Sequence, residues 1–466
     1  MLSSAEALGR ALRLAARGRY RAAPNPMVGA LVVAAGEVVG SGWHRQAGGP
    51  HAEVEALAAA GLRARGATLY VTLEPCAHHG RTPPCADAVV AAGIARVVAC
   101  HGDPDPRVAG RGFARLREAG IEVAIGPLAA AAARLNLRFL VAAIERRPQV
   151  TLKWAMSLDG RIATAAGESQ WISSPRGRRW ALALREEHDA TLVGSGTVLA
   201  DDPRLDRRLG LAGRPGLRVV LDRRRRLAAW AAAAPAGAPR RLFTAAGPLL
   251  IYTASRGGRG EEEDGGGRHE AGNGAPGLGG RSGAWDAPGD LGGEFGVAAS
   301  GEMAASETMA VSGAMVASEA MAASEAMAAS EAMAVSGAMA ASAVMVVPEV
   351  VALPAVEPAA VLADLFARGV RSVLVEGGAE VLASFAASGL FDRVAVDCAP
   401  LLIGGRQAPG PLGGRQAPGP LGGTGAAALA DAARLDHLEV RRRGGDVVVE
   451  ALRQGCLERL LARLPH

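Results

Sequence analysis

The feature that most constrains the fold is an alternation of short apolar runs with helix-forming segments in the first 146 residues. Apolar, β-branched runs predict strands at 30–34, 68–73 and 95–100. The segments between and after them predict helices over 53–60, 86–92 and 108–119, and Gly93 and Gly120 follow the last two. Alternation on this scale predicts a mostly parallel sheet with helices on its faces.

A second α/β unit begins after Pro148. Its predicted strands lie at 150–155, 190–194, 217–221, 249–253, 372–375, 394–397 and 447–450, and its predicted helices at 176–187, 359–368 and 380–388. The pattern stops at 255 and resumes near 347. We therefore expect one domain over 1–146 and a second over 150–255 and 347–455, which suits a chain of 466 residues.

Residues 256–346 differ in composition from both predicted domains. The first part is rich in Gly and charge, and a Met then recurs at every sixth position from Met303 to Met345. Six residues advance about 600° along a helix, so successive Met side chains are about 120° apart and no apolar stripe forms. We expect a disordered or transiently helical insertion.

A second repeat, of period nine, occupies 405–423. Both repeats are interpreted as expansions within loops, where added length costs little stability. A functional low-complexity linker is the alternative interpretation.

Composition excludes several classes of protein. The first 26 residues mix Arg with apolar residues, which predicts a helix and not a signal peptide. No window of about 20 residues is apolar enough to span a bilayer. Five sparse cysteines do not form a disulfide framework. We expect a cytoplasmic protein without membrane contact, and the net charge of +5 permits an anionic substrate without requiring nucleic acid.

A candidate zinc site combines HisAlaGlu at 51–53 with Cys76 and Cys85. One His and two Cys leave the fourth tetrahedral position open for water, which is typical of catalytic zinc. Predicted helix N-termini next to these residues favour the thiolate form of cysteine. Glu53 would then carry a proton from the water to the leaving amine, as in zinc deaminases. The alternative is a closed structural site that also uses His78 or His79.

The spacing of the cysteines narrows the class. Eight residues separate Cys76 from Cys85, where the general deaminase pattern has two, and GlyArgThrProProCys occupies 80–85. ProAsnProMetValGly at 24–29, GlyTrpHis at 42–44, LeuGluProCys at 73–76 and AspProAspPro at 103–106 accompany it. With these motifs, residues 1–146 resemble the deaminase half of the bifunctional riboflavin-biosynthesis deaminase/reductases. The resemblance implies a three-layer cytidine-deaminase-like fold, His51, Cys76 and Cys85 as zinc ligands, Glu53 as the catalytic proton shuttle, and Asn25 as a substrate contact.

Four motifs mark the second unit: LeuLysTrpAlaMetSerLeuAspGly at 152–160, GlyGluSerGlnTrpIle at 167–172, the segment 193–205 with its AspAspPro, and ValLeuValGluGlyGlyAlaGlu at 373–380. Ligands of open α/β sheets bind beyond the carboxyl ends of strands. The Gly377–Gly378 turn before a predicted helix can hold a phosphate group. No GxGxxG follows the first strand, so the dinucleotide fingerprint of a Rossmann fold is absent.

In this order the four motifs resemble the reductase half of the same family, which implies a dihydrofolate-reductase-like fold that binds NADPH. The implied cofactor contacts are Ala155, Trp171, Thr197, Asp201, Gly377 and Gly378, and the implied substrate contacts are Ser169, Arg185, Leu205, Arg208 and Glu376. Arg185 and Arg208 suit a phosphate, which a guanidinium binds bidentately.

Lys153 is the only lysine of the chain. Lysine can shift its pKa and donate a proton, which arginine cannot readily do. We therefore hypothesise that Lys153 is the proton partner of the ring-opened sugar. A surface lysine without a role is the alternative.

One position departs from the family pattern. Asp206 stands where the family usually has Thr after the leucine of AspAspProXLeu. A carboxylate that points inward would be unfavourable near a phosphate. The alternative is a side chain that points to solvent.

The resemblance implies two consecutive reactions. The first is zinc-dependent deamination of 2,5-diamino-6-(5-phosphoribosylamino)pyrimidin-4(3H)-one, and the second is NADPH-dependent reduction of the ribosyl group of the product to ribityl, by a homo-oligomer. A deaminase whose reductase is impaired by the insertion is one alternative. A nucleic-acid deaminase with ArgArgArgArg at 223–226 is another, although aromatic residues form only 3% of the chain and stacking platforms are scarce. The third is a non-catalytic scaffold.

Overall fold

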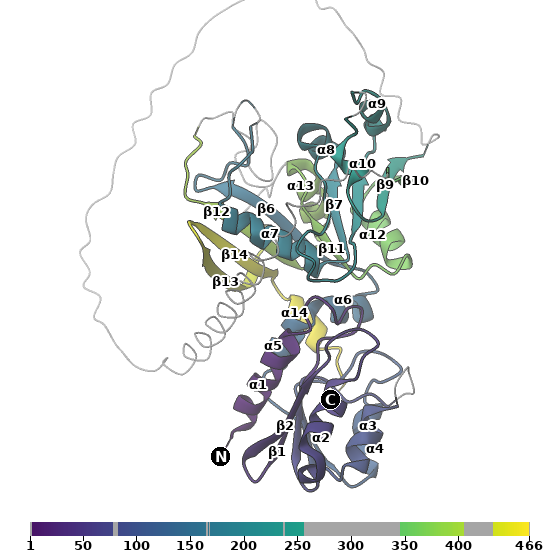
Figure 1. Ribbon diagram of the computed structural model, residues 1–466, viewed down its shortest axis with the longest axis vertical. Helices are drawn as coiled ribbons and strands as arrows, with labels where there is room; N and C mark the ends of the chain where they lie inside the picture. The colour runs from purple at the N-terminus through teal and green to yellow at the C-terminus, as the bar shows by residue number, and fades with distance from the viewer. Residues whose placement is uncertain are drawn as a thin grey trace, which may run out of the picture. The chain divides into compact units, whose positions relative to one another are not determined.

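A computed structural model describes residues 2–77, 83–164, 166, 168–235, 238–255, 345–404 and 432–465 (Figure 1). The chain divides into two compact units, Met1–Arg256 with Ala343–His466, and Gly257–Ser342. All described residues belong to the first unit. The predicted insertion lies outside them except for Met345 and Val346, and the repeat at 405–423 lies outside them entirely.

The N-terminal domain contains a five-stranded sheet in the order β2-β1-β3-β4-β5. Its strands are β1 (Gly29–Ala34), β2 (Glu37–Trp43), β3 (Thr68–Val71), β4 (Arg96–Ala99) and β5 (Glu122–Ile125). Strands β3, β4 and β5 are parallel, but β1 is antiparallel to both of its neighbours. The expectation of a mostly parallel sheet is therefore wrong for this half. Ala35 and Gly36, at φ of 49° and 83°, join β1 to β2 in a hairpin, and so short a connection permits only antiparallel pairing.

Helices cover both faces of this sheet. They are α1 (Ser4–Ala16), α2 (Ala52–Ala60), the 3-10 helix η1 (Gly61–Ala64), α3 (Cys85–Ala91), α4 (Arg111–Glu118), α5 (Ala129–Leu135) and α6 (Leu137–Glu145). Alternate residues of a strand point to opposite faces. Val32, Leu69 and Val97 accordingly pack with α2, α3 and α4, whereas Leu31 and Val98 pack with α1 and α5. This three-layer arrangement confirms the predicted fold.

Two glycines of β2 set the position of α2. A Cβ on Gly40 would stand 2.2 Å from the carbonyl oxygen of Ala56, and one on Gly42 would stand 2.5 Å from that of Ala52. Both separations are far below van der Waals contact, so only glycine permits this approach. The helix that begins after His51 is thereby held directly against the sheet.

The second domain contains a nine-stranded sheet in the order β10-β9-β8-β7-β11-β6-β12-β14-β13. The strands are β6 (Gln149–Ser157), β7 (Ala190–Gly194), β8 (Leu217–Leu221), β9 (Leu249–Ala254), β10 (Glu349–Leu353), β11 (Ser372–Val375), β12 (Arg393–Ala399), β13 (Leu435–Arg443) and β14 (Asp446–Arg453). Pairing is parallel from β10 to β12 and antiparallel from β12 through β14 to β13. The sheet is the predicted α/β layer with an antiparallel edge.

The helices of this domain are α7 (Pro175–Glu187), α8 (Ser195–Asp201), α9 (Arg226–Ala232), α10 (Arg241–Thr244), α12 (Pro358–Ala367), α13 (Ala379–Ser388) and α14 (Cys456–Leu461). Leu365 of α12 and Phe385 of α13 pack on one face of the sheet. Trp180 and Leu184 of α7 pack with Leu374 on the other face. No helix among the described residues is long and apolar enough to span a bilayer.

The two domains share a small apolar core. Leu457 and Leu460 of α14, which follows the last reductase strand, pack with Leu140 and Val141 of α6 and Ala133 of α5. The last helix of the second domain thus contacts helices of the first.

Candidate metal centre and reductase cleft

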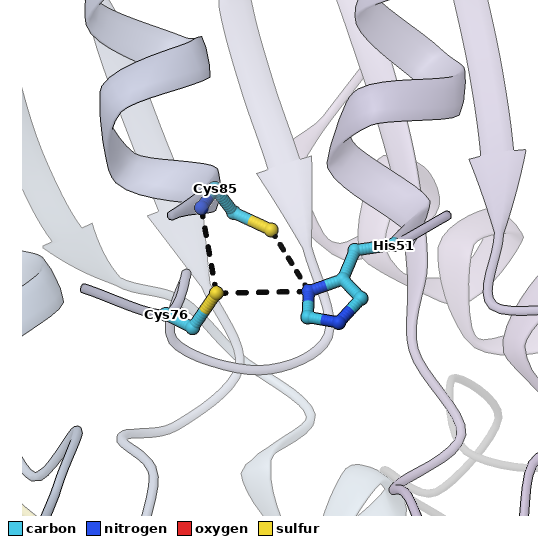
Figure 2. Close-up of side chains that lie close together, drawn as sticks. All are labelled: His51, Cys76 and Cys85. Carbon is cyan, nitrogen blue, oxygen red and sulfur yellow. Dashed lines mark hydrogen bonds between the residues drawn. The ribbon is translucent and has the colours of Figure 1, made fainter. Parts of the chain in front are cut away.

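The three predicted zinc ligands converge at the starts of two helices (Figure 2). His51 is the N-cap residue of α2, Cys85 is the first residue of α3, and Cys76 lies in the loop after β3. His51 Nδ1 is 3.0 Å from Cys85 Sγ and 3.6 Å from Cys76 Sγ. Tetrahedral zinc, with bonds of about 2.0–2.3 Å, places its ligand atoms roughly 3.3–3.8 Å apart. The donor set therefore fits zinc, the separation from Cys76 lies within this range, and the separation from Cys85 would have to widen by about 0.3 Å.

The two thiols differ in their surroundings. Hydrogen bonds from Cys85 and His51 lower the pKa of Cys76 to about 4, and the Cys85 backbone N–H also donates to Cys76 Sγ at 3.4 Å. The hydrogen bond to Cys76 and burial raise the pKa of the Cys85 thiol. Without metal, one thiolate is thus already favoured, and metal binding requires the second thiol to lose its proton as well.

Glu53 lies in the first turn of α2, where it is 3% exposed. Burial raises the pKa of its carboxyl to about 7, and His51 opposes this shift. A carboxyl with such a pKa can accept and release a proton near neutral pH. The predicted proton shuttle and the predicted ligands lie in one cluster.

Asn25 contacts His44, and His44 in turn contacts the zinc-ligand candidate His51. The Asn25 Nδ2 atom is 3.0 Å from His44 Nε2, and His44 Nδ1 is 2.9 Å from the carbonyl oxygen of Pro50. Since a carbonyl only accepts, Nδ1 carries the proton, and Nε2 accepts from the Asn25 amide. The edge of the His44 ring meets the His51 ring at 5.5 Å between centroids. The sequence interpretation gave His44 no role, because a motif does not reveal this contact.

Glu74 supports the loops behind Cys76. Its carboxylate is 3% exposed and accepts four backbone N–H groups, from Asp103, Gly110, Gly112 and Phe113, at 2.9–3.2 Å. Sequence reasoning missed this role, although an acidic residue at the end of an apolar strand is a signal of a satisfied buried charge. His78 and His79, the alternative fourth ligands, lie outside the described residues.

The predicted reductase residues gather at the carboxyl ends of the adjacent parallel strands β7, β11 and β6. Lys153 and Ala155 lie on β6, Thr197 and Asp201 on α8 after β7, and Glu376, Gly377 and Gly378 after β11. Arg185 lies in the last turn of α7, Leu205 and Arg208 lie after α8, and Ser169 and Trp171 precede α7. This is the edge at which open α/β sheets bind ligands.

Two glycines at this edge make room for the side chain of Val381. A Cβ on Gly377 would stand 2.7 Å from the Cβ of Val381, and one on Gly194 would stand 2.7 Å from its Cγ2. The Gly378 N–H donates to Thr197 Oγ1 at 3.1 Å, which joins the turn after β11 to α8. Two helix starts on neighbouring strands suit the phosphates of a dinucleotide, so the residues present fit NADPH.

Gln170 precedes Trp171 in the sequence, and its side chain contacts Asp201. Gln170 Nε2 is 3.4 Å from Asp201 Oδ1, and the ring of Trp171 is 69% exposed with the Arg178 guanidinium 4.7 Å from its centroid. An exposed indole of this kind can cover one side of a flat ligand.

Arg185 and Glu376 form a two-point ion pair at this edge of the sheet. Burial alone would raise the pKa of Glu376, but the charge and hydrogen bonds of Arg185, with a further contribution from Lys153, lower it to about 2. Glu376 is therefore ionised, and Lys153 lies within its electrostatic reach.

The solvent-facing alternative for Asp206 is wrong. This residue is 2% exposed, with Arg204 Nη2 at 2.7 Å and Arg208 Nε at 3.1 Å from its carboxylate. Burial lowers the pKa of Arg208 and Asp206 raises it. The carboxylate therefore points inward and pairs with two arginines, one of which, Arg208, is a predicted phosphate contact.

Comparison with known proteins gives two family matches. The RibD C-terminal domain matches residues 148–259 and 305–449, more than half of the chain. The cytidine and deoxycytidylate deaminase zinc-binding region matches residues 2–101.

Curated relatives match part of this chain. The riboflavin biosynthesis protein RibD of Escherichia coli is 57% identical over 198 residues, which are 42% of this chain and 54% of that protein. The corresponding Aquifex aeolicus protein is 50% identical over 212 residues, 46% of this chain and 60% of the relative. The chain thus matches a little over half the length of these curated relatives.

Solved structures align over nearly the whole chain. The Acinetobacter baumannii RibD structure has a TM-score of 0.65 at 29% identity and covers 97% of this chain and 99% of its own. The Thermotoga maritima diaminohydroxyphosphoribosylaminopyrimidine deaminase/5-amino-6-(5-phosphoribosylamino)uracil reductase has a TM-score of 0.66 at 28% identity, with coverage of 97% and 98%. With its deaminase zinc-binding region and its RibD C-terminal domain, the chain belongs to the RibD family.

Proposed function

We propose that this chain catalyses two consecutive steps of riboflavin biosynthesis. The first is deamination of 2,5-diamino-6-(5-phosphoribosylamino)pyrimidin-4(3H)-one, and the second is NADPH-dependent reduction of the ribosyl group of 5-amino-6-(5-phosphoribosylamino)uracil. The observation that carries the proposal is the convergence of His51, Cys76 and Cys85 with a buried Glu53. The names of the similar proteins identify the substrate class.

In the deamination step, His51, Cys76 and Cys85 would hold zinc, which when bound lowers the pKa of a water molecule to about 7. Glu53 accepts the proton that the water loses and donates it to the leaving amine. The amide nitrogen of Asn25 donates to His44, so its side-chain carbonyl oxygen is left to accept a hydrogen bond from an N–H of the pyrimidine ring of the substrate. Glu53 is thus the acid–base residue of this step, and Asn25 orients the substrate.

In the reduction step, NADPH when bound supplies the reducing equivalents. Arg185 and Glu376 hold each other at the carboxyl edge of the sheet. Arg208 binds the phosphate of the substrate. Lys153 donates a proton to the ring-opened sugar. If Lys153→Met retained wild-type reductase turnover with the fold intact, this role would be wrong.

The experiment on the deaminase is ammonia release from the free pyrimidine ribotide, compared with single-stranded DNA and tRNA. Release from the ribotide alone is expected, and release from nucleic acid alone would contradict the proposal. The four arginines at 223–226 give little support to nucleic-acid binding. Arg225 Nη2 donates to the Ala254 carbonyl at 2.7 Å and Arg226 Nη2 to Ser195 Oγ at 3.0 Å, so both already serve the fold.

The experiment on the reductase is NADPH oxidation with the deaminated intermediate, for the full chain and for a version without 256–346. Strands β9 and β10 flank the insertion and still pair in parallel, from Leu250 with Glu349 to Ala254 with Leu353. This pairing argues against a reductase impaired by the insertion, and equal rates are expected.

We further propose a cytoplasmic homo-oligomer that does not bind membranes. Its five cysteines are unpaired, which suits a reducing compartment. The edge strand β13 exposes Leu435, Leu438 and Val440. Exposed apolar side chains on a strand at the edge of the described sheet favour pairing with a second copy. Light scattering on the purified chain tests the oligomeric state.

A further inference from the structure

Two buried acids face each other under the first turn of α7. Asp397 on β12 and Asp446 at the start of β14 are each 1% exposed. A Cβ placed on Gly177 of α7 would stand 2.4 Å from Asp397 Oδ2 and 2.2 Å from Asp446 Oδ2. The two oxygens therefore lie on the same side of Gly177, at most 4.6 Å apart (the sum of 2.4 Å and 2.2 Å), and glycine at position 177 makes room for them.

The hydrogen bonds of the two acids are unequal. Asp446 Oδ2 accepts the backbone N–H of Ser174 at 2.8 Å. By strict geometry neither oxygen of Asp397 has a hydrogen-bond partner within the described part of the chain, although the Ser173 hydroxyl lies close enough to lower the pKa of this carboxyl by hydrogen bonding. Ionised carboxylates only accept, so two of them cannot bond to each other. A proton on Asp397 would supply the missing donor and satisfy both side chains.

The charges around the pair do not compensate two negative charges. Lys153 on β6 pairs in register with Ala395, two residues before Asp397, and lowers the pKa of Asp397. Arg178 of α7 donates to the Ser173 carbonyl, and Arg176 of α7 packs beside Gly444. Arg443 of β13 is opposite Asp446 in the ladder. Neither acid forms an ion pair within the described ranges, and Cys398 of β12 lies within electrostatic range of both acids.

Two of these effects act in the direction that a protonated Asp397 requires. Burial is the largest influence on Asp397 and raises its pKa, and Asp446 raises it further, while Ser173 and Lys153 oppose the shift. The positive N-terminus of the 13-residue helix α7 disfavours a bound cation beside the pair and stabilises the one negative charge that a singly protonated pair retains.

We propose that Asp397 and Asp446 share one proton and that this acid–carboxylate pair positions the segment 168–174. Asp446 holds Ser174, the N-cap residue of α7, and Ser173 lies beside Asp397. The same segment carries Ser169 and Trp171, the candidate substrate and cofactor contacts. Asp397 is a positioning residue that acts through this segment, and its effect on NADPH rests on the proposed function.

The first test is infrared spectroscopy of the full chain at neutral pH. The carbonyl-stretch band of a protonated carboxylic acid should weaken in Asp397→Asn relative to wild type. Glu122→Gln is the matched control, because Glu122 on β5 has a side chain that is 64% exposed and an ion pair with Arg96. Equal bands in wild type and Asp397→Asn would overturn the shared proton, whether or not the protein oxidises NADPH.

The second test is the pH dependence of the KM for NADPH. An asparagine amide can donate to Asp446 as the protonated acid does, so Asp397→Asn should keep the neutral-pH KM within about twofold. Loss of one charge-assisted hydrogen bond costs about tenfold in affinity, so the wild-type KM should rise by about that factor at alkaline pH. Asp397→Asn should stay flat.

Further outcomes separate a failure of the positioning role of Asp397 from a failure of the proposed reductase function. An alkaline rise in Asp397→Asn that matches wild type would overturn the positioning role. Asp397→Ala, which cannot donate, should show the raised KM at every pH. Wild-type protein that shows no NADPH oxidation would contradict the proposed function and leave the infrared result to decide the proton.

Discussion

Arg185 donates two parallel hydrogen bonds to Glu376, from Nε to Oε1 at 2.9 Å and from Nη2 to Oε2 at 2.7 Å. The two residues are 191 positions apart, on either side of the insertion, and their side chains are 12% and 11% exposed. A planar guanidinium fits a carboxylate in this geometry and an ammonium does not. The chain that follows the insertion therefore returns to complete the same cleft that Arg185 lines.

Arg185→Lys should impair the reductase alone. Lysine keeps the charge but loses the two-point contact with Glu376, so we expect the KM for the phosphoribosyl substrate to rise by about 10–100-fold. Steady-state NADPH oxidation measures this, and ammonia release should remain within about twofold of wild type.

The matched control is Arg214→Lys, because Arg214 pairs with Asp189 but is 52% exposed. An exposed pair contributes little, so this control should behave as wild type. Equal KM values in Arg185→Lys and Arg214→Lys would contradict the importance of the bidentate pair.

Glu53→Gln should abolish deamination while zinc stays bound. The amide cannot accept and release a proton, and loss of a general acid–base group typically costs about 10²–10⁴-fold in rate. The zinc content measured by atomic emission should stay at the wild-type level, since His51, Cys76 and Cys85 are unchanged. Glu55→Gln, on the same helix but paired with Arg45 at 3.0 Å, is the control and should remain active. Loss of zinc in Glu53→Gln would instead show a structural role.

Glu74→Gln should destabilise the loop behind the metal centre. The carboxylate accepts four backbone N–H groups, and an amide presents its own donors to some of them. We expect a loss of about 2–4 kcal/mol, since hydrogen bonds to buried charged groups are costly to break. Urea unfolding measures the loss, and hydrogen exchange should increase over 103–113. Glu118→Gln, at the exposed end of α4, should change neither measurement.

The sequence predicted the architecture well where the signal was local. Strands 190–194 and 217–221 match β7 and β8 residue for residue, because buried parallel strands form continuous apolar runs. Strand β13 was missed because its exposed and partly buried residues include three arginines in succession. Strand β10 was missed because it pairs only at the sheet edge, directly after the insertion.

The residues of the candidate metal centre were predictable from the sequence. The arrangement of side chains at the candidate reductase site was predictable only in part. His51, Cys76 and Cys85 identify their chemistry by residue type and spacing. In contrast, the inward direction of Asp206 and the meeting of Asp397 with Asp446 depend on tertiary packing. No local sequence pattern reveals which two carboxylates, from two different strands, will lie together beneath one helix.

Acid should destabilise the reductase domain through His188. This histidine is 3% exposed, its Nδ1 is 2.7 Å from the Leu184 carbonyl oxygen, and its Nε2 is 2.8 Å from Thr151 Oγ1. Burial, the largest effect, lowers the pKa of His188 to about 4. The unfolded chain binds a proton at this residue below pH about 6.5, whereas the folded chain does not do so until about pH 4.

Stability from this residue is therefore present above pH about 6.5 and is lost as the pH falls towards 4, by up to roughly 3 kcal/mol. His188→Gln should flatten that part of the curve of unfolding free energy against pH, measured by urea titration at several pH values. The control is His437→Gln, because a third of the His437 side chain is exposed. A wild-type slope retained in His188→Gln would mean that other groups cause the acid loss, since only a titrating imidazole couples this site to pH.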